Sequence, residues 1–343
     1  MEANTPEPTP VGRVIGLSAG VALIVGLITL AFAWPSADMG PHEVPIAVIG
    51  PDTAAEQVQT QLDEAQPDGF DVTAAADADQ ARALVEEREV YAALAVAPEG
   101  VTAYTASAAS PAVARLVTGI AEQVAAQLGQ AAGQPGSVQV TVEDLVALPA
   151  DDPNGAGLAA SALPLAMGGI LVAALIGLTV RGTGRQVAAA VLAPPAVGAG
   201  VAAVLLYVLE SLDGDFLPVA GALTLATAAT AWPILGLVKL LGRSGLGVGA
   251  AIVMLVGNPL SGMTSAPELL PAPWGGFGQY LTPGAGGTLL RSTAYFDGHG
   301  ASTAVWVLGA WLAAGAVLFI AGALRAKVRG VGVEEREKAE VAA

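Results

Sequence analysis

Five long apolar blocks follow one another closely in the second half of the chain, and they constrain the fold more than any other feature. None contains Asp, Glu, Lys, Arg or His, and each is 19 to 23 residues long. About 20 helical residues cross the ~30 Å hydrocarbon core of a bilayer, where only helices or closed barrels satisfy the backbone. No block shows the two-residue alternation of a barrel strand. We therefore predict five membrane helices, at residues 158–180, 187–209, 216–238, 245–263 and 303–324, which together form a membrane domain over residues 158–324.

A sixth apolar block, residues 14–34, follows a short Pro-rich tail at residues 1–13. A secretory signal peptide is the competing interpretation, but its apolar region is ~7–15 residues long and ends in small residues. This block is longer and ends in Trp34-Pro35, which favours an uncleaved span with an interfacial Trp. The predicted fold class is a polytopic α-helical membrane protein with six transmembrane helices.

The charge of the chain is concentrated in one segment. Only 13% of the residues are charged and 54% are hydrophobic, whereas soluble domains carry about 25% charged residues. The net charge of −16 falls entirely within residues 35–157, which hold 19 acidic and 3 basic residues. Such an acidic segment is unsuited to nucleic acid, whose phosphates require a basic surface. The chain has no Cys, which excludes disulfides and thiolate chemistry.

The acidic segment also carries the only pattern typical of a soluble domain. Alternating strand-like and helix-like stretches predict a mixed α/β domain with the order β-α-β-α-β-β-α-β. Ser110 followed by Pro111 predicts the start of its longest helix. The predicted strands are residues 44–49, 70–74, 91–96, 101–107 and 138–142, and the predicted helices are 53–65, 77–89 and 111–132.

Basic residues alternate with acidic ones from one connection to the next, which sets the orientation by the positive-inside rule. Two connections carry Arg181 and Arg185, and Lys239 and Arg243, while the tail after the last span, residues 325–343, begins with further basic residues. The intervening connections are acidic. We predict a plasma-membrane protein with both termini cytoplasmic and with the α/β domain and the connection 264–302 outside the cell.

No catalytic or cofactor constellation is found. The chain has no nucleotide-binding Gly-rich loop, and its two histidines, His42 and His299, are too far apart in sequence to suggest a metal pair. We therefore expect no enzyme, metal or cofactor. Proton- and ion-coupled carriers usually hold ionisable residues inside their spans. Because these spans hold none, a self-powered antiporter is disfavoured.

Small residues recur in the spans, at Gly168, Gly169, Gly198, Gly200, Gly245, Gly247, Gly249, Gly309, Ala310 and Ala314. They allow helices to approach closely. Packing inside one bundle is the favoured interpretation, and a face for a second copy of the chain is the alternative.

The outer connection, residues 264–302, is apolar and rich in Pro and aromatic residues but too broken to span. We predict an interfacial or re-entrant hairpin buried against protein. Glu268 and Arg291 either pair there or both face water. The candidate functional residues of this hairpin are Pro267, Glu268, Leu270, Pro271, Trp274, Tyr280, Pro283 and Arg291.

Several of these stretches resemble one protein family. The sequences VPIAVIGPD at residue 44 and YAALAVAPEG at residue 91 enter and cross the outer domain, and NPLSG, APELLP and QYLTP begin at residues 258, 266 and 279. Together with the architecture they resemble the ABC-2-type permeases, in the branch of the YhgE/Pip (phage infection) proteins. The resemblance implies a homodimeric permease that exports a hydrophobic or amphipathic substrate and is driven by a separate cytoplasmic ATPase.

Under this resemblance the ATPase would contact Arg181, Arg185, Lys239 and Arg243. The first of those loops, however, spans only residues 181–186, which is short for such a contact. A non-transport membrane protein is therefore the alternative: a surface receptor or an envelope-assembly factor whose outer domain binds a partner.

Overall fold

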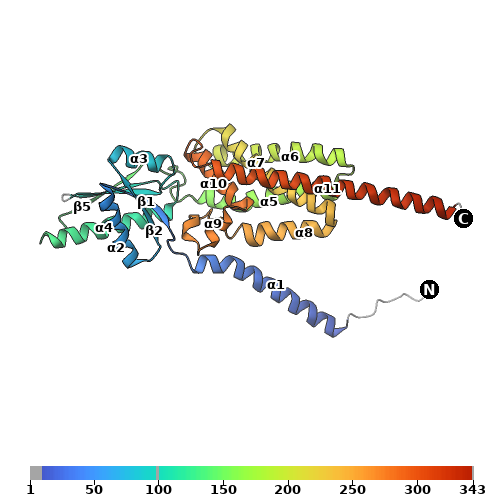
Figure 1. Ribbon diagram of the computed structural model, residues 1–343, viewed down its shortest axis with the longest axis horizontal. Helices are drawn as coiled ribbons and strands as arrows, with labels where there is room; N and C mark the ends of the chain where they lie inside the picture. Colours follow the sequence, from blue (N-terminus) through green and yellow to red (C-terminus); the bar gives the residue numbers. More distant parts are fainter. Residues whose placement is uncertain (1–9, 98–99, 342–343) are drawn as a thin grey trace.

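The computed structural model describes residues 10–97 and 100–341. A five-stranded α/β unit lies at one end, and a bundle of long helices extends away from it (Figure 1). The N-terminal helix, α1 (Val11–Ala37), runs beside the bundle and diverges from it.

The α/β unit has the predicted order of elements. Its strands are β1 (Val44–Ile49), β2 (Phe70–Ala75), β3 (Ala92–Ala97), β4 (Gly100–Thr105) and β5 (Gln139–Asp144), and its helices are α2 (Asp52–Ala65), α3 (Ala78–Glu86) and α4 (Pro111–Ala131). The Ser110 hydroxyl accepts a hydrogen bond from the Val113 amide at the start of α4, which confirms the predicted cap.

The sheet is mixed, with the strand order β2-β1-β3-β4-β5. Only β3 and β4 pair antiparallel, as the two arms of a hairpin. Alternate residues of the strands fill two cores: α4 covers one face through Val113 and Val117, and α3 covers the other through Ala81 and Val85. Successive residues of a strand point to opposite faces of the sheet, and residues three or four apart share one face of a helix. These two spacings direct the apolar side chains into the two cores.

Five helices are long and apolar enough to cross a membrane, among the residues the structure describes. They are α1, α5 (Ala156–Thr179), α6 with its π-helical end η1 (Thr183–Val208), α7 (Phe216–Leu241) and the first part of α11 (Ser302–Val328). In full, α11 runs from Ser302 to Val341, so it passes the predicted end of the last span without a break.

The fourth of the five blocks departs from the prediction of a full span at 245–263. It forms the short helix α8 (Arg243–Ala251), continued by the π-helix η2 (Ile252–Gly257). At 1.5 Å per residue this segment is shorter than the ~30 Å core. It ends where Pro259 lacks an amide for helical pairing and Gly262 takes a left-handed φ of 64°.

Helix α7 is the centre of the bundle and packs against α5, α6, α8, α10 and α11. Glycines allow these close approaches. A Cβ added at Gly315 of α11 would collide with the backbone of Trp232 and Pro233 in α7, whereas Gly309 on the same helix has nothing within 4 Å. Gly169, Gly198, Gly245 and Gly249 likewise face α7 at close range, so packing within one chain accounts for these four. Gly200 and Gly247, like Gly309, have nothing within 4 Å, so close packing does not account for them.

The start of α5 is held by an acidic residue. The Asp152 carboxylate accepts hydrogen bonds from the backbone amides of Ala156, at 2.7 Å, and Gly157, at 2.6 Å. Those amides have no partner within the helix. Asp152 is itself 7% exposed, so the α/β unit is joined to the bundle by a capped, ordered connection.

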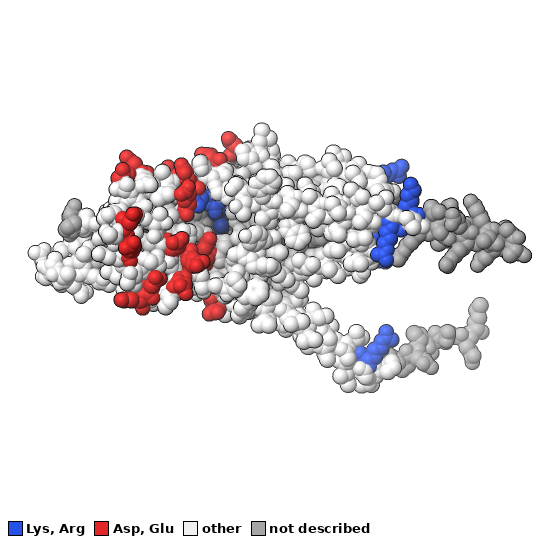
Figure 2. Space-filling model, viewed as in Figure 1, with Lys and Arg blue, Asp and Glu red and all other residues white. Residues whose placement is uncertain are grey.

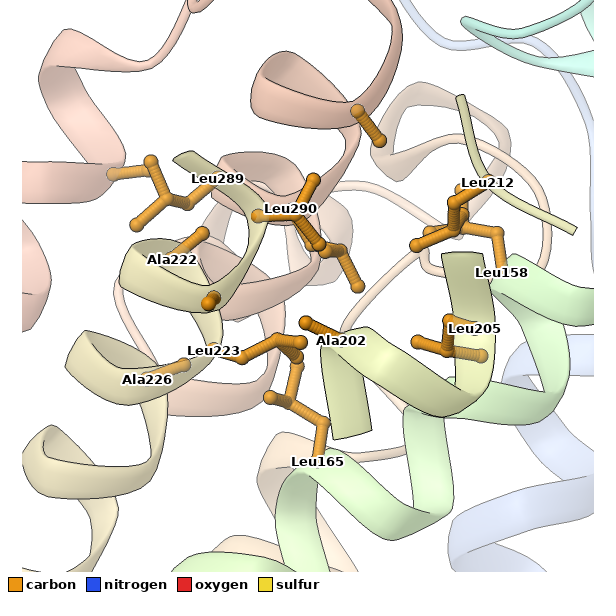
Figure 3. Packing of buried hydrophobic residues seen from close by; sticks show 14 of the residues in the cluster. Leu158, Leu165, Ala202, Leu205, Leu212, Ala222, Leu223, Ala226, Leu289 and Leu290 are labelled. Atoms are coloured by element: carbon orange, nitrogen blue, oxygen red, sulfur yellow. The ribbon is translucent and has the colours of Figure 1, made fainter. Parts of the chain in front are cut away.

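The hairpin 264–302 folds into three short helices: η3 (Pro267–Leu269), α9 (Trp274–Gly278) and α10 (Thr282–Tyr295). Helix α10 packs into the bundle. Its Leu289 and Leu290 join the largest apolar cluster, together with residues of α5, α6 and α7 (Figure 3). The hairpin also enters the outer unit, since Leu269 belongs to one of its cores and Phe296 to the other.

Candidate functional site

The candidate site is the junction where the α/β unit meets the hairpin. The connection between α3 and β3 supplies Arg88 and Tyr91, η3 supplies Glu268, and α10 supplies Thr288 and Ser292. These residues are about 180 to 200 positions apart in sequence, and hydrogen bonds join them across the junction.

Arg88 crosses from the outer unit to the hairpin. Its Nη1 donates to the Ser292 hydroxyl at 2.5 Å and lies 3.4 Å from the Thr288 carbonyl. Its guanidinium also lies 5.1 Å from the centre of the Phe296 ring, a cation–π distance. Arg88 has a left-handed φ of 62°, just after the end of α3. This conformation is uncommon for a residue other than Gly, and the contacts of the Arg88 side chain with the hairpin help to hold it.

Tyr91 makes the second crossing. Its hydroxyl donates to the Glu268 carboxylate at 2.7 Å, and burial beside that carboxylate raises the pKa of Tyr91. Two backbone bonds support this contact: the Gly40 amide donates to the Leu269 carbonyl at 3.1 Å, and the His42 amide donates to the Glu268 carbonyl at 2.8 Å. The segment leading into β1 is thereby tied to η3.

Arg291 lies behind this layer and is only 3% exposed. Its Nη2 donates to the Met263 carbonyl at 3.0 Å, and its Nε has no partner within the described residues. Both alternatives predicted for Glu268 and Arg291 are wrong, because Arg291 faces protein rather than water and Glu268 bonds Tyr91 instead. Burial lowers the pKa of Arg291.

A cavity of about 320 Å³ opens at the junction. The residues of its wall with polar side chains are Arg88, Glu89, Tyr91, Glu268, Gln279, Thr288 and Thr303. A wider groove of about 850 Å³ adjoins it, since Glu268, Gln279 and Thr303 line both. The rim of that groove is acidic, with Glu43, Asp63, Asp68 and Asp71. Figure 2 shows the acidic side chains gathered over this outer end of the molecule.

The predicted hairpin residues lie in three settings. Pro267 and Glu268 line the cavity and the groove, while Leu270 and Tyr280 line the groove alone. Pro271 and Pro283 are buried. The exposed Trp274 packs edge-to-face against Trp34 of α1, with ring centres 5.9 Å apart. Through this pair the hairpin contacts the N-terminal helix.

Basic side chains gather at the end of the bundle opposite the α/β unit (Figure 2), and the four residues predicted to contact an ATPase belong to the connections between long helices or lie beside them. Arg181 and Arg185 lie in and just after the connection between α5 and α6, Lys239 in the last turn of α7, and Arg243 at the start of α8. The structure therefore brings these four residues to one end of the bundle.

A second, apolar groove lies on the side of the bundle between α5 and α6. Its volume is about 440 Å³, and its lining is apolar apart from Ser161. Pro164, Ala196, Val197, Gly200 and Val204 form part of its wall. The groove exists because the side chains that line it are small; larger side chains would fill the gap between the helices.

Sequence reasoning missed Arg88, Tyr91, Thr288 and Ser292. One signal was present, because Arg88 is one of only three basic residues in the acidic segment. Its partners could not be inferred, since nothing local in the sequence indicates a contact 204 residues away.

No family model, curated protein or solved structure matches this chain. The resemblance to ABC-2-type permeases therefore rests on the sequence stretches and the architecture alone.

Proposed function

We propose that this chain is the membrane-spanning subunit of an ABC-2-type exporter, which moves a hydrophobic or amphipathic molecule outward with energy from a separate ATPase. The observation that carries the proposal is the apolar groove between α5 and α6. An apolar recess on the flank of a membrane bundle suits a hydrocarbon chain, because such a chain can enter from the lipid without crossing water.

The distribution of charge supports an external energy source. The five long helices hold no Asp, Glu or His, and their Lys and Arg residues all lie near one end: Arg13, Arg185, Lys239, Arg325 and Lys327. Proton relays and ion sites need ionisable groups inside the spans. An ATPase that docks on the basic end, at Arg181, Arg185, Lys239 and Arg243, would supply the energy instead.

The proposed topology has six crossings in the plasma membrane. The short segment Arg243–Gly257 and the turn after it make the fifth, and both termini are cytoplasmic, with residues 35–157 outside. Support comes from the positive-inside rule, because basic side chains gather at the end of the bundle opposite the acidic α/β unit (Figure 2). The resemblance further implies a homodimer in the bilayer.

Affinity purification of the full chain in mild detergent tests the proposal. We expect an ATPase to co-purify, with hydrolysis that depends on this chain. The double variant Arg181→Glu/Arg185→Glu should lose the ATPase. Arg115→Glu, a single charge reversal on an exposed residue of α4 in the outer unit, should retain it. Reproducible absence of any ATPase from the wild-type preparation would refute the exporter.

The wide acidic groove favours a second candidate, a non-transport membrane protein whose outer unit binds a partner. Its volume of about 850 Å³ and its rim of four carboxylates suit a basic segment of another protein. In that case crosslinking on intact cells would capture an outer partner whose binding is lost when Asp63, Asp68 and Asp71 are changed to Asn. No ATPase would be needed for function.

A further inference from the structure

The sheet of the α/β unit has two edge strands, β2 and β5, and the edge of β2 is closed. The Gln59 side chain of α2 donates to the Phe70 carbonyl and accepts from the Val72 amide, each at 2.9 Å. The next strand of a sheet would make the same pair of bonds. The Gln59 amide therefore takes the place of a neighbouring strand, and α2 packs against β2.

The edge of β5 has no such group. The Leu145 amide, just after β5, donates to the Thr105 carbonyl of β4. Because the backbone groups of successive strand residues point to opposite sides, the odd-numbered residues of β5 bond β4 and the even-numbered ones face outward. The amides and carbonyls of Val140 and Val142 therefore lie along the open edge, and no hydrogen bond to them occurs within residues 10–97 and 100–341.

Little else covers β5. Val142 is 46% exposed, and among the helices and strands of the described chain β5 packs closely only against β4 and α4. The two charged residues of β5 are engaged within the unit: Glu143 pairs with Arg82 at 3.1 Å, and the Asp144 carboxylate accepts from the Ser107 amide at 2.9 Å. An exposed edge of β-branched residues, without Pro or a covering element, is a template for another strand.

The acidity of the outer unit is concentrated in other elements. Residues 35–97, which include β1, β2, α2 and α3, hold 13 acidic and two basic residues, whereas residues 100–150 hold three acidic residues and one basic residue. One of those three, Glu143, is already paired. The segment that contains β5 is therefore nearly neutral, so main-chain hydrogen bonds rather than charge would supply the affinity for a partner.

A second copy of the chain does not suit this edge. β1 begins beside the hairpin, where the His42 amide donates to the Glu268 carbonyl, and β5 leads to Asp152 at the start of α5. The strands therefore run along the long direction of the molecule (Figure 1). A two-fold axis pairs two identical strands only in the antiparallel sense. Such a pair would point the two bundles in opposite directions, and one membrane could not hold both.

We propose that β5 is a strand-addition site, at which an extended segment of a different protein bonds the backbone of Val140 and Val142. Val140 packs in the core that α4 covers, and Val142 shares its face because it lies two residues further on. The segment would alternate apolar and polar side chains, with the apolar ones on the α4 face, where they cover Val142. This assembly does not rest on transport and needs no ATPase.

Hydrogen exchange of the purified full chain in neutral detergent tests the proposal. The probe is a short peptide of alternating Val and Thr, flanked by Lys for solubility. In the free chain the outward amides of Val140 and Val142 should exchange rapidly, while those of Thr141 and Glu143, which bond β4, stay protected. The peptide should slow exchange of the outward amides, by about tenfold when its concentration is about ten times its dissociation constant.

Two variants at one position separate backbone pairing from packing. Val142→Pro removes an outward amide and no bond to β4, a change that edge strands tolerate, and the peptide should no longer protect the Val140 amide. Val142→Thr keeps the amide and the branched side chain, and it should be protected as the wild type is. If Val142→Pro does not fold, the probe carries the test, because the same peptide with Pro at its central position should give no protection.

Three results would overturn the proposal. The first is no protection by the peptide at about 1 mM, which bounds the affinity from above. The second is equal protection by the peptide with the central Pro. The third is protection of the outward amides in the chain without peptide, which, together with a dimer in light scattering, would assign the edge to a second copy.

Discussion

The hydrogen bond between Tyr91 and Glu268 offers the sharpest test of the junction. Tyr91→Phe removes one oxygen and leaves the ring in place. The lost bond is 2.7 Å long and runs to a carboxylate, and hydrogen bonds to charged groups contribute about 1.5–3 kcal/mol. Since 1.4 kcal/mol is a factor of ten, opening of the junction should become roughly 10- to 150-fold more frequent. Glu268 is only half-buried, so water will compensate in part, and we expect about tenfold.

Hydrogen exchange measures that opening directly. The Gly40 and His42 amides donate to the Leu269 and Glu268 carbonyls across the junction, so they exchange only when the junction opens. In Tyr91→Phe their exchange should accelerate about tenfold, while amides between β1 and β2 remain protected.

Tyr104→Phe is the matched control. Tyr104 lies in the same outer unit and is 7% exposed, and its hydroxyl makes no hydrogen bond within the part of the chain that the structure describes. Exchange of the Gly40 and His42 amides should be unchanged in this variant. If Tyr91→Phe changed their exchange less than about threefold, or no more than Tyr104→Phe does, the junction would not be held by this bond.

Three further predictions follow from the bundle and its ends. Gly315→Ala should destabilise the chain by about 1–3 kcal/mol in thermal unfolding followed by Trp fluorescence, because its Cβ meets the α7 backbone; Gly309→Ala, on an open face, should be neutral or slightly stabilising. Asp152→Ala should cost about 1–2 kcal/mol in the same assay by freeing two helix amides, whereas a similar loss in Asp151→Ala would contradict the capping role. Because the chain has no Cys, single cysteines report topology: an impermeant maleimide on intact cells should label Ser137→Cys but not Ser244→Cys, and the reverse would invert the proposed orientation.

The α/β unit could be predicted closely because its signals are local. Strand alternation, helix spacing and the Ser110 cap each act within a few residues, and together they gave the observed order of eight elements. Of the six apolar blocks predicted to span, five correspond to the five long apolar helices of the described residues. The block at 245–263 misled because apolar composition does not distinguish a full span from a short helix that ends in a π-helix and a turn.

The junction could not be predicted for a different reason. The position of Arg88 depends on the left-handed end of α3 and on Ser292 of α10, and neither has a local signature. The buried helix α10 was also missed as a helix. Its sequence, TPGAGGTLLRSTAY, holds three Gly and one Pro, so intrinsic propensity opposes a helix and burial against α7 stabilises it instead.

The hairpin is the element through which the bundle and the outer unit can act on each other. Leu290 of α10 is packed in the bundle, while Leu269 and Phe296 at the hairpin's two ends are packed in the two cores of the α/β unit. Well-packed cores do not deform continuously, so a shift of α10 against α7 must be absorbed where packing gives way to polar contacts and a cavity. That place is the layer of Arg88, Tyr91 and Glu268. A ligand held there would add contacts between the outer unit and α10, and it would thereby bias any movement that passes between them.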